Sequence, residues 1–397
     1  MMQRVFKAAQ VFDGWTLHKD AAVSLHDDGH IADLHPAARD VPPGAEVTDL
    51  GAVILAPGLV DLQVNGGGGV MIGRDTDADQ LARICAVHAG LGATTILPTL
   101  ITDTPEVTRN VIAAGIEATR RAVPGFAGLH LEGPHLDPAR KGAHDARLIR
   151  PMTAEDLDLL CHAASRLPAL MLTVAPHSVT PDQITTLHRA GAIVSLGHSD
   201  CTAAQARIAQ EAGARCVTHL YNAMNALQNR APGLVGAALT RPFKAGLIAD
   251  GVHVAPECLE VALRMKGADD LFLVSDSMAA AGTDITEFML NGRRILRQDR
   301  RLTLADGTLA GADISLPQSV AHLVGLGVPV ARALAMASRI PADVIGARDR
   351  GRITPGARGD LVALSETMAL RAAWRQDMGW MEDARETMCV RARHVQS

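Results

Sequence analysis

The sequence predicts a (β/α)8 TIM barrel joined to a small β-sandwich domain that both termini build. Its 397 residues exceed one average domain but suit a barrel of roughly 250 residues with an appended unit. After Pro57, brief apolar runs of strand length alternate with Ala- and Leu-rich helical stretches, which is typical of repeated βα units and a parallel sheet. The two ends of the chain instead show short β-like stretches separated by turn residues. We therefore expect the β-sandwich over 1–55 and 346–397 and the barrel over 56–345.

The β-sandwich is indicated by short segments at each end of the chain. Near the N-terminus, apolar and polar residues alternate in Arg4-Val5-Phe6-Lys7 and Ala22-Val23-Ser24-Leu25, with turn signals such as Asp27-Asp28-Gly29 between such stretches. Three segments near the C-terminus are also β-like: Gly351–Ile353, Leu361–Leu364 and Met388–Val390.

The barrel strands are expected at eight apolar runs. They are Leu59–Val64, Ala93–Thr99, Gly128–Glu132, Leu170–Ala175, Ile193–Gly197, Cys216–Leu220, Gly246–Asp250 and Leu271–Asp276. Helical periodicity predicts Ala154–Arg166 after the cap residue Thr153, and Ala203–Glu211 after Ser199-Asp200. Two further helices are expected over Ser319–Leu326 and Ala331–Ala337.

Composition excludes several classes of function. The net charge of −5 comes from nearly balanced acids and bases without a long run of one sign, which argues against a nucleic-acid surface. The six cysteines include no C-x-x-C pair, so a zinc knuckle or redox dithiol is not expected and reduced thiols fit better. No uncharged apolar run of membrane-spanning length and no signal-like start is present, so we expect a cytoplasmic protein without a membrane partner.

Ionisable residues stand where several of the expected strands end. Glu132 closes the third run, His198 and His219 lie at the ends of the fifth and sixth, and Asp276 closes the eighth. Taken singly, a histidine is more often a surface or core residue, and a strand-end aspartate often caps the next helix. Because active sites of TIM barrels lie at the C-terminal ends of the strands, the coincidence of the four predicts one site.

These four residues predict metal-assisted hydrolysis. One glutamate and two histidines form a ligand set that zinc accepts in catalytic sites, where a further position stays open for water. Zinc lowers the pKa of such a water toward roughly 7, and Asp276 is the expected acid that passes the proton to the leaving nitrogen. We expect Zn²⁺, although Fe²⁺, Co²⁺ and Mn²⁺ also tolerate this ligand set.

Six segments then carry a family resemblance across most of the chain. They are Pro57-Gly58-Leu59-Val60-Asp61-Leu62-Gln63-Val64-Asn65-Gly66, Leu131-Glu132-Gly133-Pro134, Lys141-Gly142-Ala143-His144, Gly197-His198-Ser199, Thr218-His219-Leu220-Tyr221-Asn222-Ala223-Met224 and Asp250-Gly251-Val252-His253-Val254. In order and spacing they resemble the N-acetylglucosamine-6-phosphate deacetylase family of the amidohydrolase superfamily. The tail from Gly351 to Val362 is similar to the superfamily's return into its small β domain.

The resemblance implies roles for the residues at the metal. Glu132, His198 and His219 would hold it. Asp276 would act first as general base and then as general acid, and His144 would help to polarise the acetyl carbonyl.

The resemblance also implies a substrate site. Asn222 and the backbone of Ala223 would bind substrate, while Arg230 and His253 would contact its phosphate. A bidentate guanidinium suits phosphate, and a protonated His253 adds charge. In the family these last two residues lie at the subunit boundary, which implies a homodimer. The alternatives are that Arg230 is a solvated loop charge and that His253 is a satisfied side chain at the barrel end.

The first expected strand indicates a single metal. Many amidohydrolases place His-x-His there for a second ion, whereas this chain has Gln63-Val64-Asn65, and neutral amides are poor zinc ligands. We expect one divalent metal per subunit. Gln63 and Asn65 either orient loops or contact metal-bound water or substrate. The following glycines, Gly66 to Gly69, lack the Gly-Lys-Ser/Thr ending of a phosphate loop, so backbone freedom is their expected purpose.

The expected reaction is hydrolysis of N-acetylglucosamine 6-phosphate to glucosamine 6-phosphate and acetate, in amino-sugar catabolism. Two departures from the family pattern bear on the sugar epimer: Ala175-Pro176-His177 where Ala-Pro-Glu is frequent, and Ser275-Asp276-Ser277 where Thr-Asp-Ala is common. The alternatives are a deacetylase for the galactosamine epimer, an amidohydrolase for an N-acyl amino acid or a cyclic amide, and a catalytically silent barrel used as a scaffold.

Overall fold

The computed structural model describes residues 4–41 and 45–382. Within that part of the chain, packing separates two compact units. The first contains residues 4–60, 86–95 and 315–382, leaving out 42–44, and the second contains 61–85 and 96–314. The domain limits expected from the sequence, 1–55, 56–345 and 346–397, stay a prediction.

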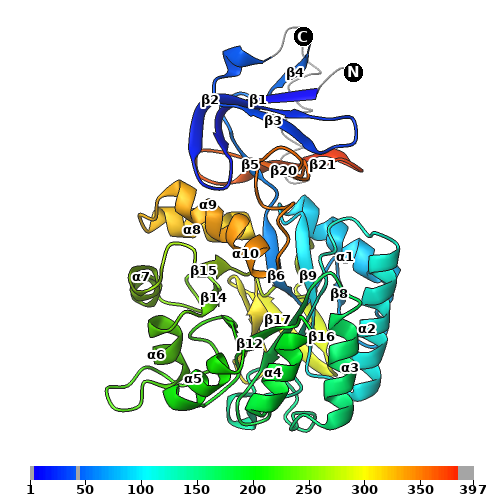
Figure 1. The fold of residues 1–397 in the computed structure, drawn as a ribbon, viewed down its shortest axis with the longest axis vertical. Helices are drawn as coiled ribbons and strands as arrows, with labels where there is room; N and C mark the ends of the chain where they lie inside the picture. The colour runs from blue at the N-terminus through cyan, green and yellow to red at the C-terminus, as the bar shows by residue number, and fades with distance from the viewer. Residues whose placement is uncertain (1–3, 42–44, 383–397) are drawn as a thin grey trace. The chain divides into compact units, whose positions relative to one another are not determined.

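The second unit is built on a barrel of eight parallel strands, seen at the centre of Figure 1. In chain order and in sheet order these are β6 (Val60–Val64), β9 (Thr95–Ile101), β10 (Leu129–Glu132), β11 (Leu170–Val174), β12 (Ile193–Leu196), β13 (Cys216–Val217), β14 (Lys244–Leu247) and β15 (Leu271–Leu273). Val64 forms a parallel bridge with Ser277, and the Asn65 N–H donates to the Ser277 carbonyl at 2.8 Å. The segment that follows the last strand therefore meets the end of the first, the barrel is nearly closed, and the expected TIM barrel is confirmed.

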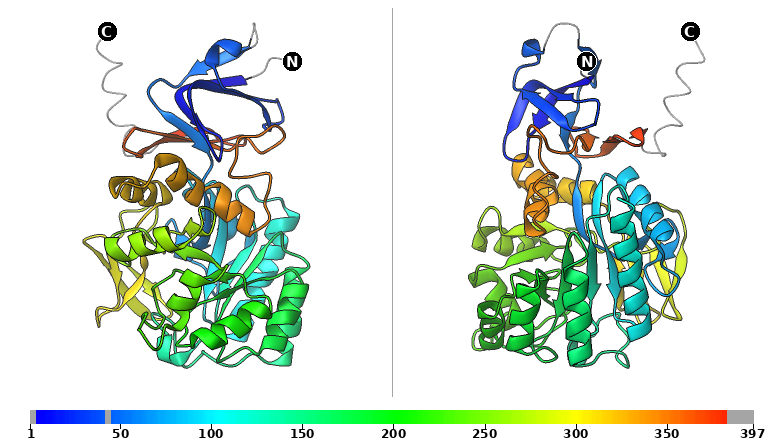
Figure 2. Two further views of the ribbon diagram at one scale, coloured as in Figure 1. Left: turned by 60° about the vertical axis from the view of Figure 1, so that its left-hand side comes forward. Right: turned by 45° about the vertical axis from the view of Figure 1, so that its right-hand side comes forward.

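Helices lie around these strands (Figure 2). The α-helices that follow the first seven strands, one after each, are α1 (Ala78–Gly90), α2 (Pro105–Arg120), α3 (Ala154–Ala164), α4 (Pro181–Arg189), α5 (Ala203–Glu211), α6 (Gly233–Thr240) and α7 (Pro256–Met265). Thr153 caps α3 as expected. The cap expected for α5 is wrong: Thr202, not Ser199-Asp200, accepts from the Gln205 N–H, and the Gln205 side chain reaches back to the Thr202 N–H.

An antiparallel sheet follows β15 and was not expected from the sequence. It consists of β16 (Glu287–Leu290), β17 (Arg293–Gln298), β18 (Arg301–Thr303) and β19 (Leu309–Ala312). Asn291 and Gly292 connect the first two strands with φ angles of 47° and 75°, as a type I′ hairpin turn requires. Its apolar residues, among them Phe288 and Leu290, pack on residues 278–280.

The first unit holds the β domain. Its sheet consists of β1 (Arg4–Phe12), β2 (Leu17–Leu25), β3 (Ile31–His35), β4 (Glu46–Asp49), β5 (Ile54–Pro57), β20 (Leu361–Leu364), β21 (Leu370–Arg375) and β22 (Gly379–Glu382). Because β5 pairs with β1 on one side and β20 on the other, the two ends of the chain share one sheet, as expected. Its core includes Phe6, Val23 and Trp374.

The remaining expectations at the C-terminal side have mixed outcomes. The two expected helices correspond to α8 (Leu316–Gly325) and α9 (Val330–Ala337), and α10 (Arg339–Val344) follows. The strand expected at Gly351–Ile353 is wrong, because Gly351 turns at φ 68° and the Ile353 N–H bonds singly to the Asp13 carbonyl. Met388–Val390 lies outside the described residues.

The glycine run after β6 forms a tight hairpin. β7 (Gly66–Gly67) pairs with β8 (Val70–Met71), and Gly68 and Gly69 turn at φ 62° and 87°. These two angles use the backbone freedom expected of this run, and Gly66 is needed for a different reason, because a Cβ there would lie 2.3 Å from the Val70 carbonyl oxygen. In the described part of the chain, none of the helices is long and apolar enough to cross a membrane.

Candidate metal centre and active site

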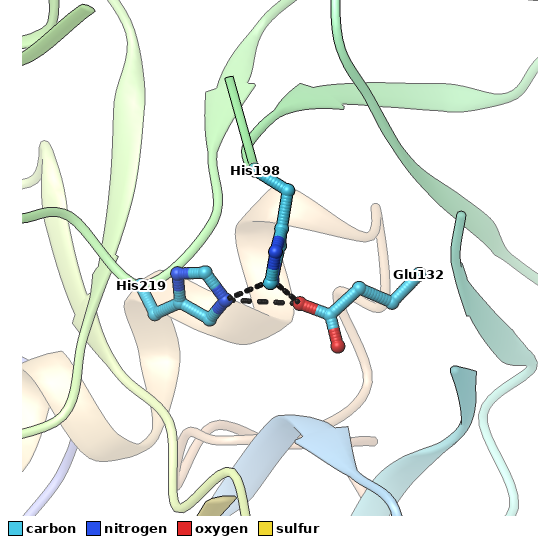
Figure 3. A group of neighbouring side chains, drawn as sticks. All are labelled: Glu132, His198 and His219. Carbon is cyan, nitrogen blue, oxygen red and sulfur yellow. Dashed lines mark hydrogen bonds and ion pairs between the residues drawn. The ribbon is translucent and has the colours of Figure 1, made fainter. Parts of the chain in front are cut away.

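Glu132, His198 and His219 converge at one end of the barrel (Figure 3). Glu132 ends β10, while His198 and His219 each follow a strand by two residues. Glu132 Oε1 lies 2.9 Å from His219 Nε2 and 3.2 Å from His198 Nε2, and the two ring nitrogens are 3.2 Å apart. All three side chains are buried. Two imidazoles and a carboxylate thus direct their ligand atoms at one another.

The tautomer of His198 decides which of its ring nitrogens can face a cation. His198 Nδ1 lies 2.9 Å from the Arg140 carbonyl oxygen, which can only accept, so Nδ1 donates. In the neutral ring Nε2 then presents a lone pair toward Glu132 and His219, as in metal-bound histidines whose other nitrogen is held by a carbonyl. Glutamate and histidine are ligands that divalent zinc-like cations prefer, so the residues fit such a metal.

Charge in this cluster is concentrated on Glu132. Burial opposes its ionisation, but the adjacent His198 and His219 rings, the second with its Nε2 hydrogen-bonded to Oε1, hold the pKa of Glu132 well below its ordinary value. Burial likewise disfavours a charged His219, while its hydrogen bond to Glu132 outweighs this and raises the pKa of His219. The carboxylate is therefore ionised at neutral pH and attracts positive charge to this point.

Asp276 lies beside the cluster and is held by two amides. Gln63 Nε2 donates to Asp276 Oδ1 at 3.1 Å and to Glu132 Oε1 at 3.1 Å, and Asn65 Nδ2 donates to the same Asp276 oxygen at 2.7 Å. Burial and the nearby charge of Glu132 raise the pKa of Asp276 to about 6. A carboxyl group with that pKa is mostly ionised at pH 7 yet accepts a proton readily, which suits acid–base work.

His144 faces Glu132 across the site. Its Nε2 lies 3.8 Å from Glu132 Oε2, and its Nδ1 lies 2.8 Å from Thr102 Oγ1 and accepts from the Thr102 N–H at 3.3 Å. Because the backbone N–H can only donate, Nδ1 carries no proton and Nε2 does. Burial lowers the pKa of His144 to about 3, and the neighbouring His198 adds to the effect. His144 is thus a neutral donor through Nε2.

A cavity of about 260 Å³ opens over these groups. Its polar lining includes Asn65, Glu132, His144, His198, His219, Asn222, His253 and Asp276, with Ala223 beside them. Its apolar lining includes Ile101, Ile248, Met278, Leu290 and Leu309. Most of the expected site residues therefore meet in one place, with an apolar wall that sequence reasoning did not foresee.

Two expected site residues do not line the cavity. Gln63 does not line the cavity, and its side chain holds the carboxylates of Glu132 and Asp276 rather than orienting loops. Arg230 is exposed on the 225–232 loop of the single chain. The two departures in the sequence also lie outside the lining: His177 Nδ1 is 3.2 Å from Asp137 Oδ2, and Ser275 Oγ donates to Ser277 Oγ at 2.8 Å.

His253 reaches the cavity from the loop after β14. Its Nδ1 is 2.6 Å from Asp250 Oδ2, and the N–H groups of Val252 and His253 donate to the other oxygen of Asp250. Burial raises the pKa of Asp250, but these hydrogen bonds outweigh burial and lower it. The ionised Asp250 therefore holds the His253 ring in place through its Nδ1 atom.

A buried chain of hydrogen bonds ties together the strands that carry the ligands. Ser195, Thr218, Thr173 and His130 are linked in that order at 2.6, 2.6 and 2.7 Å, and His130 Nδ1 donates to the Leu62 carbonyl at 3.0 Å. Burial lowers the pKa of His130 to about 4, so it is neutral at pH 7. These bonds fix β6, β10, β11, β12 and β13 relative to one another just beneath the site.

Thr102, the partner of His144, is a site residue that strand-end reasoning missed. The strand that carries it was expected to end at Thr99, whereas β9 continues to Ile101. Polar residues at the C-terminal end of a barrel strand are candidate site residues, which is how Glu132 was found. With β9 ending at Ile101, the same rule would also have found Thr102. The cavity residues Leu290 and Leu309 belong to the unexpected antiparallel sheet, for which Asn291-Gly292 was the available signal.

Known proteins resemble this chain along most of its length. Residues 54–382 match the amidohydrolase family. N-acetylgalactosamine-6-phosphate deacetylase of Shewanella sp. (strain ANA-3) is 39% identical over 322 residues, covering 81% of each chain. N-acetylglucosamine-6-phosphate deacetylase of Haemophilus influenzae is 32% identical over 360 residues, covering 89% of this chain and 93% of that protein.

Solved structures of such deacetylases share the fold. The N-acetylglucosamine-6-phosphate deacetylase from Pasteurella multocida has a TM-score of 0.91 at 32% identity, covering 96% of this chain and all of that one. A mutant of the Mycobacterium smegmatis enzyme, solved with N-acetyl-D-glucosamine-6-phosphate, has a TM-score of 0.88 at 29% identity with the same coverage.

Proposed function

Because the chain belongs to the metal-dependent amidohydrolase family, we propose that it removes the acetyl group from an N-acetylated amino-sugar 6-phosphate. The substrate we propose is N-acetylglucosamine 6-phosphate, which yields glucosamine 6-phosphate and acetate in amino-sugar catabolism. The observation that carries this proposal is the convergence of Glu132, His198 and His219 in a cavity that also contains Asp276 and His144. The relatives named for the same reaction support the substrate class.

Glu132, His198 and His219 would hold one divalent metal, for which Zn²⁺ is our first choice and Fe²⁺, Co²⁺ and Mn²⁺ are alternatives. Such an ion supplies Lewis-acid activation of a water molecule. A single ion is supported by Gln63, whose amide nitrogen contacts both Glu132 and Asp276 at 3.1 Å and so stands between the carboxylates. Elemental analysis that finds two tightly bound metals per subunit would contradict this part of the proposal.

Asp276 and His144 would move protons and stabilise charge. Both amide donors bind Oδ1 of Asp276, so Oδ2 is left to take the proton of the attacking water and pass it to the departing amine. His144 would donate from Nε2 to the acyl oxygen as negative charge develops there. Its neutral form, with Nδ1 held by Thr102, suits this donation.

Substrate contacts would come from the other residues of the cavity. Asn222 and the backbone of Ala223 are proposed for the sugar and His253 for the phosphate. The buried Oδ1 of Asn65 has no hydrogen-bond partner among the described residues, which supports a contact between Asn65 and substrate or water. Arg230 lies outside the cavity of its own chain, so we propose a homodimer in which it reaches the phosphate at the neighbour's site. A cytoplasmic location is part of the same proposal.

A second candidate is the galactosamine epimer as the preferred substrate. It is favoured by the 39% identity to an N-acetylgalactosamine-6-phosphate deacetylase, which exceeds the 32% to the glucosamine enzyme of Haemophilus influenzae. The departures at His177 and Ser275 do not line the cavity and so favour neither epimer.

The deciding experiment is an acetate-release assay. N-acetylglucosamine 6-phosphate, N-acetylgalactosamine 6-phosphate and unphosphorylated N-acetylglucosamine are compared by kcat/KM, with and without a chelator. We expect the 6-phosphates to be preferred and the chelator to abolish release. Absence of acetate release from every substrate would refute the proposed function. A higher kcat/KM for N-acetylgalactosamine 6-phosphate would make that sugar, instead of N-acetylglucosamine 6-phosphate, the proposed substrate.

A further inference from the structure

The hairpin formed by β16 and β17 touches the segment that carries His144. Arg293, the first residue of β17, donates from its guanidinium group to the carbonyl oxygen of Ala143. Asn291, in the turn of the same hairpin, donates to the Thr102 carbonyl through a long contact of 3.5 Å. Thr102 is the residue that holds Nδ1 of His144. The hairpin tip therefore contacts the backbone of the residue before His144 and the backbone of the residue that holds its ring.

Apolar packing strengthens this contact. Ala143 packs against the cluster that includes Phe288 and Leu290 of β16, and Leu290 lines the cavity together with Ala143 and His144. Residues 141–146 belong to no helix or strand. Their position consequently depends on such side-chain and backbone contacts rather than on a ladder of hydrogen bonds.

We propose that Arg293 is a positioning residue for deacetylation, holding the Ala143 carbonyl so that Nε2 of His144 is directed at the acyl oxygen. This inference rests on the proposed function and adds to it a residue from outside the barrel strands. Arginine suits the task because its planar, permanently charged guanidinium offers several donors in a fixed geometry. A hydrogen bond from a charged donor is also stronger than one from a neutral group.

The kinetic test compares Arg293→Met with a matched control, Arg294→Met. Arg294 is the next residue on β17, is exposed and pairs with Glu287, away from the cavity. With metal content equalised, Arg293→Met is expected to lower kcat on N-acetylglucosamine 6-phosphate about tenfold or more, because small displacements of a catalytic group have large effects on rate. KM should change less than about twofold. Arg293→Lys should recover part of the loss, since its ammonium can donate to the same carbonyl.

A double-mutant cycle with His144→Gln separates positioning from a general structural effect. If Arg293 acts through His144, Arg293→Met should lower kcat less than about twofold when His144 is already absent. The inference is overturned if Arg293→Met lowers kcat equally in the wild type and in His144→Gln. It is also overturned if Arg293→Met lowers kcat no more than Arg294→Met does.

A measurement without turnover keeps this test independent of the proposed function. The ¹⁵N resonances of the His144 ring, assigned by their loss in His144→Gln, should shift or broaden in Arg293→Met and stay in place in Arg294→Met. Unchanged resonances in Arg293→Met overturn the positioning role even if the chain releases no acetate. A wild-type chain that releases no acetate, while these resonances respond as expected, contradicts the proposed function alone.

Discussion

Several residues at the cavity adopt a backbone conformation that side chains other than glycine rarely take. His198, His219, Ala223 and Asp276 have φ angles of 44°, 28°, 50° and 48°. Left-handed residues other than glycine cost of order 1–3 kcal/mol each and persist where the surroundings over-determine them. Their concentration after the barrel strands that carry the metal ligands is independent support for a functional site there, because backbone strain of this kind clusters at active sites and ligand-binding segments.

Asp276→Asn is expected to remove proton transfer and little else. Asparagine tolerates the left-handed conformation, and its carbonyl oxygen can still accept from Gln63 and Asn65. We expect kcat to fall by about a hundredfold or more with bound metal unchanged, which steady-state kinetics and elemental analysis will measure. A kcat near that of the wild type would remove Asp276 from its assigned role.

Gly142→Ala is expected to weaken metal binding. Gly142 has φ 54°, and a Cβ there would lie 3.2 Å from Cε1 of the His198 ring, so the ring must move. We expect about a tenfold weaker affinity for Zn²⁺ in a competition titration, from a displacement worth about 1.4 kcal/mol. The matched control is Gly69→Ala, which has φ 87° and no heavy atom within 4 Å of its Cβ. Equal affinities of the two variants would show that His198 is not held through Gly142.

At the scale of elements, α3 begins on a charged cap that should make its stability acid-sensitive. Asp156 accepts hydrogen bonds from the Arg150 guanidinium and the Thr153 N–H. Burial raises the pKa of Asp156, but these hydrogen bonds outweigh burial and lower it to about 2. Because the folded pKa lies below the unfolded value of about 3.9, this stabilisation is present above pH 4 and is lost as the pH falls from about 4 to 2.

Asp156→Asn should therefore lower the free energy of unfolding by roughly 1–2 kcal/mol at pH 7, after allowance for partial solvent exposure. The difference from wild type should shrink as the pH is lowered toward 2, as thermal denaturation at a series of pH values will show. Asp158→Asn, exposed on the same helix, serves as the control. A difference that does not vary with pH would mean that the carboxylate charge is not what stabilises the cap.

How far the elements could be predicted depended on where their stabilising contacts lie. Barrel strands such as β9 and β11 are buried along their whole length, so each is a mostly apolar run in the sequence. In contrast, β17 reads Arg-Arg-Ile-Leu-Arg-Gln, and only Ile295 is fully buried, against residues from elsewhere in the chain. The metal ligands were predictable because they follow apolar strands, whereas the roles of Thr102 and Arg293 depend on contacts between distant segments.

At the scale of the whole molecule, metal and fold should be linked. A cation that binds Glu132, His198 and His219 only in the folded chain stabilises it, by about 2.7 kcal/mol when the free metal is a hundred times Kd. Dialysis against a chelator should therefore lower the Tm in scanning calorimetry, and added Zn²⁺ should restore it. In Glu132→Gln the chelator should have no further effect. A Tm of the wild type that is insensitive to the chelator would contradict a folded-state metal site.

The pairing of β5 with β20 has a consequence for how the protein is made. Strand β20 is synthesised about three hundred residues after β5, so at 5–20 residues per second the ribosome needs roughly 15–60 s to deliver it. During that interval β5 is an open sheet edge, a template on which another nascent chain can add a strand. The architecture thus carries a built-in window of aggregation risk, and a cell that overproduces this protein must shield that edge until translation ends.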